Sequence, residues 1–234
     1  MLSEIELKAI NMSMKWQMTK FILLNAPRLV GKDVAITHLK SIGYPLQVLE
    51  CKEHLHKLTM SLFNIPEDQY WGIYNDRAVK EVPLECFKIK EGEYFKLLEY
   101  LDPDYTKKYN TLESVVCPDY WLSIRQAMIY ASELVCKPAF GEDYFGMVRA
   151  ENVQHGLYID GSCGFPEELP PLIGKVGQEN ILLVRIHRNG FTFDGDSRGY
   201  IPDGVIDNTI DLENNGSEFQ YLFSIEKVIR GFLK

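Results

Sequence analysis

A short apolar run that leads through a tight loop into a helical pattern constrains this chain more than any other stretch. It reads FILLNAPRLVGKDVAITHL and extends from Phe21 to Leu39. Four consecutive apolar residues that end in a loop are typical of a buried strand in a parallel sheet. Apolar residues at helical spacing follow from Val34, and Gly43 and Pro45 are expected to end that helix. The stretch therefore predicts a strand, a loop and a helix in succession, which is the opening unit of many α/β folds.

The loop in this stretch matches a phosphate-binding loop except at two positions. The usual loop reads Gly, four residues, Gly-Lys and then Ser or Thr, whereas this chain carries Ala26 at the first glycine and Asp33 at the hydroxyl position. Alanine costs roughly 1 kcal/mol there only if its φ angle must be positive. A carboxylate at position 33 can hold Mg²⁺ directly or through water. Neither departure removes the expectation of a phosphate site.

Each part of such a loop has a physical role in holding a phosphate. Successive backbone N–H groups point inward at the start of a helix, and Gly31 allows the backbone to approach the anion closely. Lys32 would bring a mobile positive charge to the β- and γ-phosphates. The loop residues expected to bind the nucleotide are Ala26, Pro27, Arg28, Leu29, Val30, Gly31, Lys32 and Asp33. The alternative is an ordinary strand-to-helix turn in which Lys32 is merely solvated.

Composition and charge narrow the functional classes. The chain has 234 residues, 46% of them hydrophobic, and a formal net charge of -8. An acidic balance argues against a nucleic-acid partner, which needs a cationic face to displace counterions. No apolar run reaches about 18 residues, so no membrane span is expected, and residues 1–20 lack the continuous apolar core of a secretory signal. The five cysteines are widely spaced without a CxxC pair, which is typical of reduced thiols. We expect a cytoplasmic protein.

Further elements follow from the patterning along the chain. Short apolar runs predict strands at 155–162 and 180–190, and helical spacing predicts helices at 47–63, 121–135 and 217–233. The apolar stripe expected for the last helix is Phe219, Leu222, Ile225, Val228 and Ile229. A weaker helical pattern is present between residues 2 and 14.

The succession of these elements predicts an α/β fold with a parallel sheet flanked by helices. Its core would comprise about residues 20–50 and 145–234. The mostly helical stretch at about 51–144 would then be an inserted lobe. The segment DGDSRG, 194–199, lacks the glutamate that closes a calcium loop and predicts a turn between the last strand and the C-terminal tail.

Several segments, taken in order, resemble one enzyme family. They are the Gly-Lys-Asp loop, NDRAVKEVP (75–83), SIRQAMIYASE (123–133), PAFGEDYF (138–145) and YIDG…FPEE (158–168). Together they resemble the deoxynucleoside monophosphate kinases of tailed bacteriophages, which are P-loop nucleoside monophosphate kinases whose loop usually reads Gly-Lys-Asp. The stretch TIDLENNGSEFQYL, 209–222, is similar to that family's turn into its last helix. The resemblance extends from about residue 20 to the end of the chain.

The resemblance implies a P-loop NTPase fold and an ATP-dependent kinase. Such an enzyme transfers the γ-phosphoryl group of ATP, with Mg²⁺, to a deoxynucleoside monophosphate and yields the diphosphate. Phosphoryl transfer mainly requires positioning and charge neutralisation. In this interpretation Lys32, Asp33 and Arg125 are catalytic: Lys32 cradles the donor phosphates, Asp33 helps to place Mg²⁺, and Arg125 reaches across both nucleotides. If the protein is encoded by a phage, its compartment is the host cytoplasm. A homodimer is one assembly that the sequence allows.

The resemblance also suggests residues for the acceptor. Those assigned to substrate binding are Arg77, Lys80, Trp121, Arg125, Glu133 and Asp160. Arg77 and Lys80 would meet the acceptor's phosphate, or else they lie on a solvated helix face. Trp121 would stack on the acceptor's base or belong to the core. Arg125 and Glu133 are expected to point away from the apolar stripe of their helix, where the two could also pair with each other.

Asp160 and two departures from the family pattern leave alternatives open. Asp160 ends a buried strand at the mouth of the sheet, the usual place for ligand chemistry, where it could hold a metal-bound water or cap the next turn. The family commonly has an arginine soon after this acid, whereas this chain reads DGSCGFPEE. The missing arginine and the presence of Ala26 in place of glycine leave open a second interpretation, a nucleotide-binding P-loop module that has lost its catalytic activity. A kinase for another small phosphorylated acceptor is a third possibility. The retained Lys32, Asp33, Arg77 and Arg125 favour the kinase.

Overall fold

The computed structural model describes residues 19–50, 52–102, 119–194 and 196–234, which form two compact units. The first unit comprises the described residues up to Glu50 and from Phe145 onward, and the second comprises those from Lys52 to Tyr144. The helical pattern at residues 2–14 lies outside the described ranges. None of the helices in the described ranges is long and apolar enough to cross a membrane.

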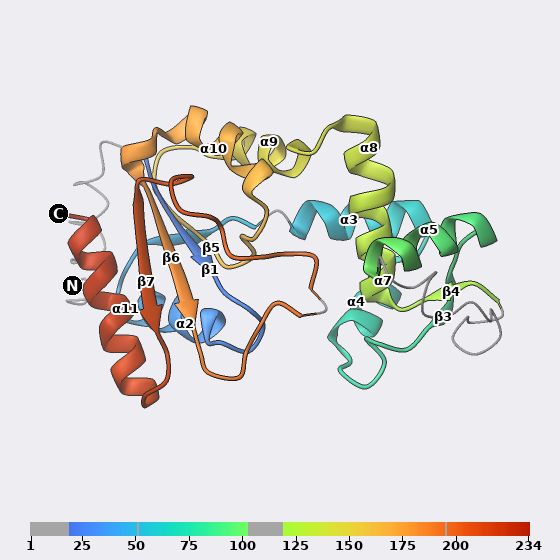
Figure 1. The fold of residues 1–234 in the computed structure, drawn as a ribbon, viewed down its shortest axis with the longest axis horizontal. Coiled ribbons are helices and arrows are strands. Elements are labelled where there is room, and N and C mark those ends of the chain that lie inside the picture. The colour runs from blue at the N-terminus through green and yellow to red at the C-terminus, as the bar shows by residue number, and fades with distance from the viewer. Residues whose placement is uncertain (1–18, 51, 103–118, 195) are drawn as a thin grey trace, which may run out of the picture. The chain divides into compact units, whose positions relative to one another are not determined.

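A five-stranded parallel sheet forms the centre of the first unit (Figure 1). Its strands are β1 (Lys20–Asn25), β2 (Leu46–Val48), β5 (Leu157–Asp160), β6 (Ile181–His187) and β7 (Asn208–Glu213). They lie in the order β2-β5-β1-β6-β7, and every neighbouring pair is parallel. The expected α/β class with a parallel sheet is therefore confirmed.

The central strand β1 is buried on both faces, as its uninterrupted apolar sequence requires. Every residue from Phe21 to Leu24 has no exposed surface. Ile22 and Leu24 point into one hydrophobic cluster and Phe21 and Leu23 into another, because successive side chains of a strand alternate between the faces of a sheet. Leu23 pairs with Asp160 of β5, so the carboxyl ends of these strands meet at one edge of the sheet.

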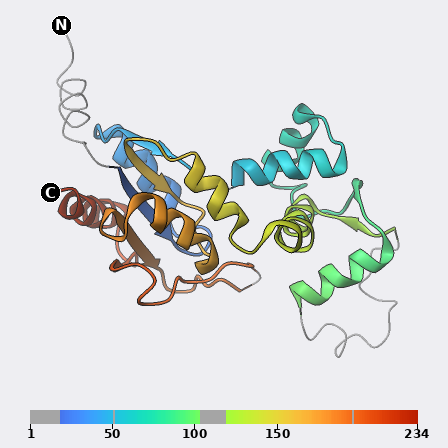
Figure 2. The ribbon, with the colours of Figure 1, turned by 90° about the horizontal axis from the view of Figure 1, so that it is seen from above.

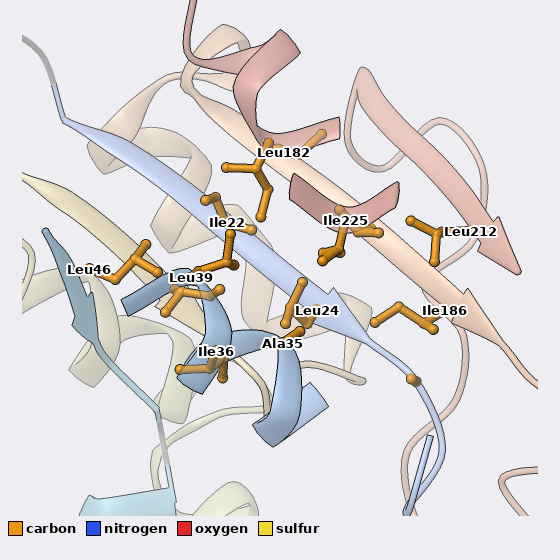
Figure 3. Close-up of a cluster of buried hydrophobic side chains, with 14 of the residues drawn as sticks. Ile22, Leu24, Ala35, Ile36, Leu39, Leu46, Leu182, Ile186, Leu212 and Ile225 are labelled. Atoms are coloured by element: carbon orange, nitrogen blue, oxygen red, sulfur yellow. The ribbon is translucent and has the colours of Figure 1, made fainter. Parts of the chain in front are cut away.

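Helices cover both faces of this sheet (Figures 1 and 2). Helix α2 (Lys32–Ser41) and helix α11 (Glu218–Phe232) pack on one face, where Leu39 and Ile225 surround Ile22 (Figure 3). Helix α10 (Leu169–Val176) packs on the opposite face through Leu169 and Leu172. The first unit also contains helix α9 (Tyr144–Glu151) from its second residue onward and two 3₁₀ turns, Pro166–Glu168 and Gln178–Asn180.

The second unit is mostly helical and has its own core. Its helices are α3 (Lys52–Phe63), α4 (Glu67–Asn75), α5 (Glu91–Leu101), α7 (Ile124–Ile129) and α8 (Lys137–Phe140), with a π-helical segment at Tyr130–Cys136. Strands β3 (Leu84–Lys88) and β4 (Trp121–Leu122) form an antiparallel pair. Fully buried Tyr70, Phe87, Leu97, Leu122 and Ile124 form the centre of its core.

The structure corrects four expectations about elements. The helix expected at 47–63 is described only from Lys52, because Leu46–Val48 form β2 instead. The helix expected at 121–135 begins after β4, where Ser123 caps it in a capping box with Gln126. Phe219 does not belong to the buried stripe of α11, since it is 78% exposed. The described residues of the segment 194–199 precede β7, so this segment does not lie between the last strand and the C-terminal tail.

Candidate phosphate-binding site

The loop between β1 and α2 has the backbone shape that a phosphate site needs at its helix end. Gly31 precedes the helix with φ 104° and ψ 16°, a left-handed conformation that favours glycine. Ala26 is fully buried and is absent from the described non-glycine residues with positive φ, so the penalty considered for alanine does not arise. Leu29 carries the positive φ instead, at 61°, and its side chain is exposed.

Lys32 folds back over this loop. Its Nζ donates hydrogen bonds to the carbonyl oxygens of Ala26 at 2.6 Å and of Pro27 at 2.7 Å. Burial and the charge of Arg198 lower the pKa of Lys32 to about 8, although Asp33 and other acids oppose the shift. The ammonium group is therefore part of the loop already, and an anion bound beside it would favour its charged form.

Two residues from the C-terminal part of the chain also hold the loop between β1 and α2, through its carbonyl oxygens. Asn214 donates from Nδ2 to the carbonyl oxygen of Val30 at 2.7 Å, and the Tyr221 hydroxyl donates to that of Gly31 at 3.1 Å. A Cβ atom at position 31 would lie 3.1 Å from both side chains. Glycine is therefore required at position 31 for its backbone angle and for the close packing around it. Neither Asn214 nor Tyr221 was expected in the site.

Asn25, the last residue of β1, holds neighbouring loops beside the loop between β1 and α2. Its buried side chain donates to the carbonyl oxygens of Cys163 at 3.1 Å and Gly199 at 3.0 Å and accepts from the Ile201 amide at 2.9 Å. The connection after β1 runs through α2 on one face of the sheet, and the connection after β5 runs through α10 on the other. Ligands of α/β proteins bind in the crevice where connections diverge in this way.

Asp160 is fully buried and uses both carboxylate oxygens within the protein. Its Oδ2 pairs with Arg149 Nη1 of α9 at 2.6 Å. Its Oδ1 accepts from the Ser162 amide and the Ser162 hydroxyl, each at 2.6 Å. Asp160 therefore caps the turn that follows β5, which is one of its two expected roles. Its part in substrate binding stays a prediction.

Asp33 lies in the first turn of α2 and is exposed. An acidic residue at this position favours the helix dipole whether or not a metal is bound. The described residues include no group of three or more His, Cys, Asp or Glu side chains arranged to hold a metal ion. Asp33 would therefore have to share Mg²⁺ with phosphate oxygens and water, as Mg²⁺ commonly does.

Arg198 is a further cation near the loop that was not expected. It lies in the segment between β6 and β7 and forms a bidentate pair with Asp196, with Nε–Oδ1 3.0 Å and Nη2–Oδ2 2.7 Å. Arg28, in the loop between β1 and α2, reaches the same carboxylate, with Nε–Oδ2 3.4 Å. No motif indicated this arrangement, because Arg28 and Arg198 are far apart in the sequence.

The remaining predicted residues lie in the second unit. Arg77 is exposed in a turn after α4, and Lys80 in the same turn lies 3.5 Å from the centre of the Tyr74 ring. The alternative expectation, that Arg77 and Lys80 lie on a solvated helix face, is therefore wrong. Arg125 Nε pairs with Glu81 Oε1 at 2.7 Å.

Glu133 does not accompany Arg125. Its side chain is 7% exposed and pairs with Lys137 Nζ at 2.9 Å, and it also accepts from the Ser132 hydroxyl at 2.7 Å. The expectation that Glu133 points outward is wrong, because the helix changes to π geometry at Tyr130 and shifts the spacing of the side chains that follow. Trp121 is half-buried in β4, and its Nε1 finds no hydrogen-bond acceptor in the part of the chain that the structure describes.

Comparisons with known proteins do not add to this geometry. No protein-family model matches the chain, and no curated protein sequence matches it. Any assignment of function therefore has to come from the chemistry of the site and from the motifs in the sequence.

Proposed function

We propose that this protein is an ATP-dependent deoxynucleoside monophosphate kinase. It would transfer the γ-phosphoryl group of MgATP to a deoxynucleoside monophosphate, giving ADP and the deoxynucleoside diphosphate. The observation that carries the proposal is Lys32, whose ammonium lies against a glycine-ended loop between the central parallel strand and a helix. A strand, loop and helix of this kind, with a lysine at the helix start, suit the phosphates of a nucleotide.

The chemistry of phosphoryl transfer fits the donor side of this site. The amides at the start of α2 and the positive end of its dipole favour a polyphosphate. Lys32 would neutralise charge on the β- and γ-phosphates. Asp33 would help to hold Mg²⁺, which would supply further positive charge to the phosphates. Charge neutralisation and alignment provide most of the catalysis in reactions of this class, so no covalent intermediate on the protein is needed.

The acceptor side of the proposal comes from the family resemblance. Arg77 and Lys80 are proposed to bind the acceptor's phosphate, Trp121 to contact its base, and Arg125 to stabilise the transferring group. Arg125 is suited to this task because a planar guanidinium matches two phosphate oxygens and stays charged at any pH of interest.

A coupled assay of ADP formation tests the proposal. The protein is mixed with MgATP and, in turn, with each common deoxynucleoside monophosphate and the matching ribonucleotides. We expect turnover with at least one deoxynucleotide and none after Lys32→Ala. Turnover only with other phosphorylated acceptors would redirect the proposal to a different kinase. If MgATP binds in a manner that depends on Lys32 but no acceptor supports turnover, the protein is instead a nucleotide-binding module without catalysis.

A further inference from the structure

An aspartate lies between two arginines beside the phosphate loop. The carboxylate of Asp196 takes the fork of Arg198 through both oxygens, at 3.0 and 2.7 Å, and meets Nε of Arg28 at 3.4 Å. The side chains of Asp196 and Arg198 are only 10% and 20% exposed, whereas that of Arg28 is 42% exposed. This is a largely desolvated ion cluster, unlike an ordinary surface pair.

Arg198 is held firmly in this position. Its aliphatic stem packs against Gly164, where a Cβ atom would lie 2.5 Å from Arg198 Cβ. Its Nη1 donates to the carbonyl oxygen of Ser162 at 3.4 Å, and the Gly199 amide donates to that of Gly164 at 3.0 Å. The guanidinium is thus fixed between the loop after β5 and its own segment, near enough to lower the pKa of Lys32.

The geometry of the cluster is one that a phosphate can reproduce. A guanidinium fork accepts a carboxylate or a phosphate in the same bidentate manner. Burial alone would raise the pKa of Asp196, but hydrogen bonds and charge from Arg198, with a contribution from Arg28, hold that pKa below its usual range. Asp196 is therefore an anion at neutral pH, and it occupies groups that a polyphosphate beside Lys32 would also seek.

We propose that Arg28 and Arg198 bind the same polyphosphate as Lys32, and that Asp196 occupies their guanidinium groups until this ligand displaces it. The inference rests on the proposed function for the position of the polyphosphate at the loop. It adds Arg198 to the phosphate-binding residues, gives the side chain of Arg28 a direct contact with the phosphates, and makes Asp196 an internal competitor that sets nucleotide affinity. Arg198 also gives the site a cation beside the loop after β5, where the sequence DGSCGFPEE has none.

The test is calorimetric titration of the full chain with inorganic tripolyphosphate and with MgATP. Arg198→Gln should weaken binding about tenfold or more, because it removes a charged bidentate donor, and Arg198→Lys should restore part of the loss. Asp196→Asn should tighten binding by about threefold or more, since it removes the competing charge. Asparagine retains the Oδ1 that accepts from the Arg198 amide at 3.2 Å, so the turn is kept.

A matched control is available in the same unit. Asp211 forms a bidentate pair with Arg185, with Nε–Oδ1 2.9 Å and Nη2–Oδ2 2.6 Å, on β6 and β7. Asp211→Asn should leave both affinities unchanged. If Asp196 and Arg198 form only a structural pair, Asp196→Asn would weaken binding and lower the melting temperature in step with Arg198→Gln, which would overturn the inference.

The remaining outcomes separate this inference from the proposed function. Binding that Lys32→Ala abolishes but the Arg198 and Asp196 variants leave unchanged would overturn the inference alone. A parent protein that binds neither tripolyphosphate nor MgATP would overturn the inference together with the phosphate loop itself.

Discussion

Lys32 is a partly buried cation whose charge changes at a pH that solution experiments can reach. Its pKa is lowered to about 8, chiefly by burial and then by the charge of Arg198. A lysine with this shift is protonated below about pH 8 and increasingly neutral above it. In the unliganded protein the shift disfavours the folded state at low pH, so this residue's contribution to stability should improve as the pH rises from about 8 toward the unfolded value. A bound phosphate reverses the preference by favouring the ammonium.

The affinity for MgATP should therefore fall as the pH rises above about 8, by up to about tenfold per pH unit, because binding must then be accompanied by proton uptake at Lys32. Lys32→Arg should abolish this dependence, since arginine stays charged. Calorimetric titrations at pH 7, 8 and 9 measure it in both proteins. The same pH dependence in the arginine variant would show that another group is responsible.

Asp33 has two possible roles that one substitution separates. Asp33→Asn should raise the Mg²⁺ concentration needed for half-maximal turnover, because a neutral amide is a weaker ligand for a hard cation. It should also cost about 0.3–1 kcal/mol of unfolding free energy through the helix dipole. Rates across a Mg²⁺ titration and urea unfolding of the same sample measure both effects. Loss of stability with unchanged metal dependence would show that Asp33 does not bind Mg²⁺.

Single residues of the site could be predicted only where neighbours in the sequence define them. Gly31 and Lys32 stand next to each other at the start of a helix that follows a strand, and their proposed roles follow from that position. Asn25, Asn214 and Tyr221 act through contacts across 138 to 190 residues, which no local pattern encodes. A buried Asn at the end of an apolar strand was the one available signal, because such a side chain must find hydrogen-bond partners.

At the scale of elements, the candidate site is defined by β1, α2 and the loop between them, which ends at Gly31. Gly31→Ala should destabilise the fold by about 1 kcal/mol for the left-handed backbone and by about 1 kcal/mol more for the crowding by Asn214 and Tyr221. Gly204→Ala is the control, since Gly204 has φ 81° and no atom near its Cβ position. Urea unfolding compares the two variants. Equal losses would mean that the packing around position 31 is slack.

The accuracy of the predicted elements depends on how far each is buried. The central strands β1 and β6 carry long apolar runs because both faces are covered, and the sequence located them. Strand β2 has only three residues, two of them exposed, and β7 has one buried residue among six. Such edge strands carry no long apolar run, so backbone pairing with a neighbour decides their conformation.

At the scale of the whole molecule, the next prediction concerns Arg125, which belongs to the second unit. Arg125→Lys should lower kcat about 100-fold with a smaller change in MgATP affinity, because the planar fork is lost while the charge remains. Glu81→Gln is the matched control, since it removes the partner that Arg125 has in the structure. It should leave kcat nearly normal. The Arg125–Glu81 pair is exposed and therefore worth about 1 kcal/mol or less to stability.

A purely structural Arg125 gives a different pattern. Both variants would then lower the melting temperature slightly and leave kcat unchanged. Measuring the melting temperature and kcat on the same samples distinguishes the two roles. The family resemblance was enough to propose a role for Arg125. Its ion pair with Glu81 could not be predicted in the same way, because that pair depends on the fold of the turn after α4.

Phosphoryl transfer itself is tested most directly by following the γ-phosphoryl group of ATP. The protein is incubated with Mg²⁺, γ-labelled ATP and a deoxynucleoside monophosphate, and the products are separated. We predict that the label appears in the deoxynucleoside diphosphate with the parent protein and that none appears there with Lys32→Ala. Label that remains in ATP or is released only as inorganic phosphate with every deoxynucleotide, or equal transfer by the Lys32→Ala variant, would contradict the assignment of this site as a deoxynucleoside monophosphate kinase.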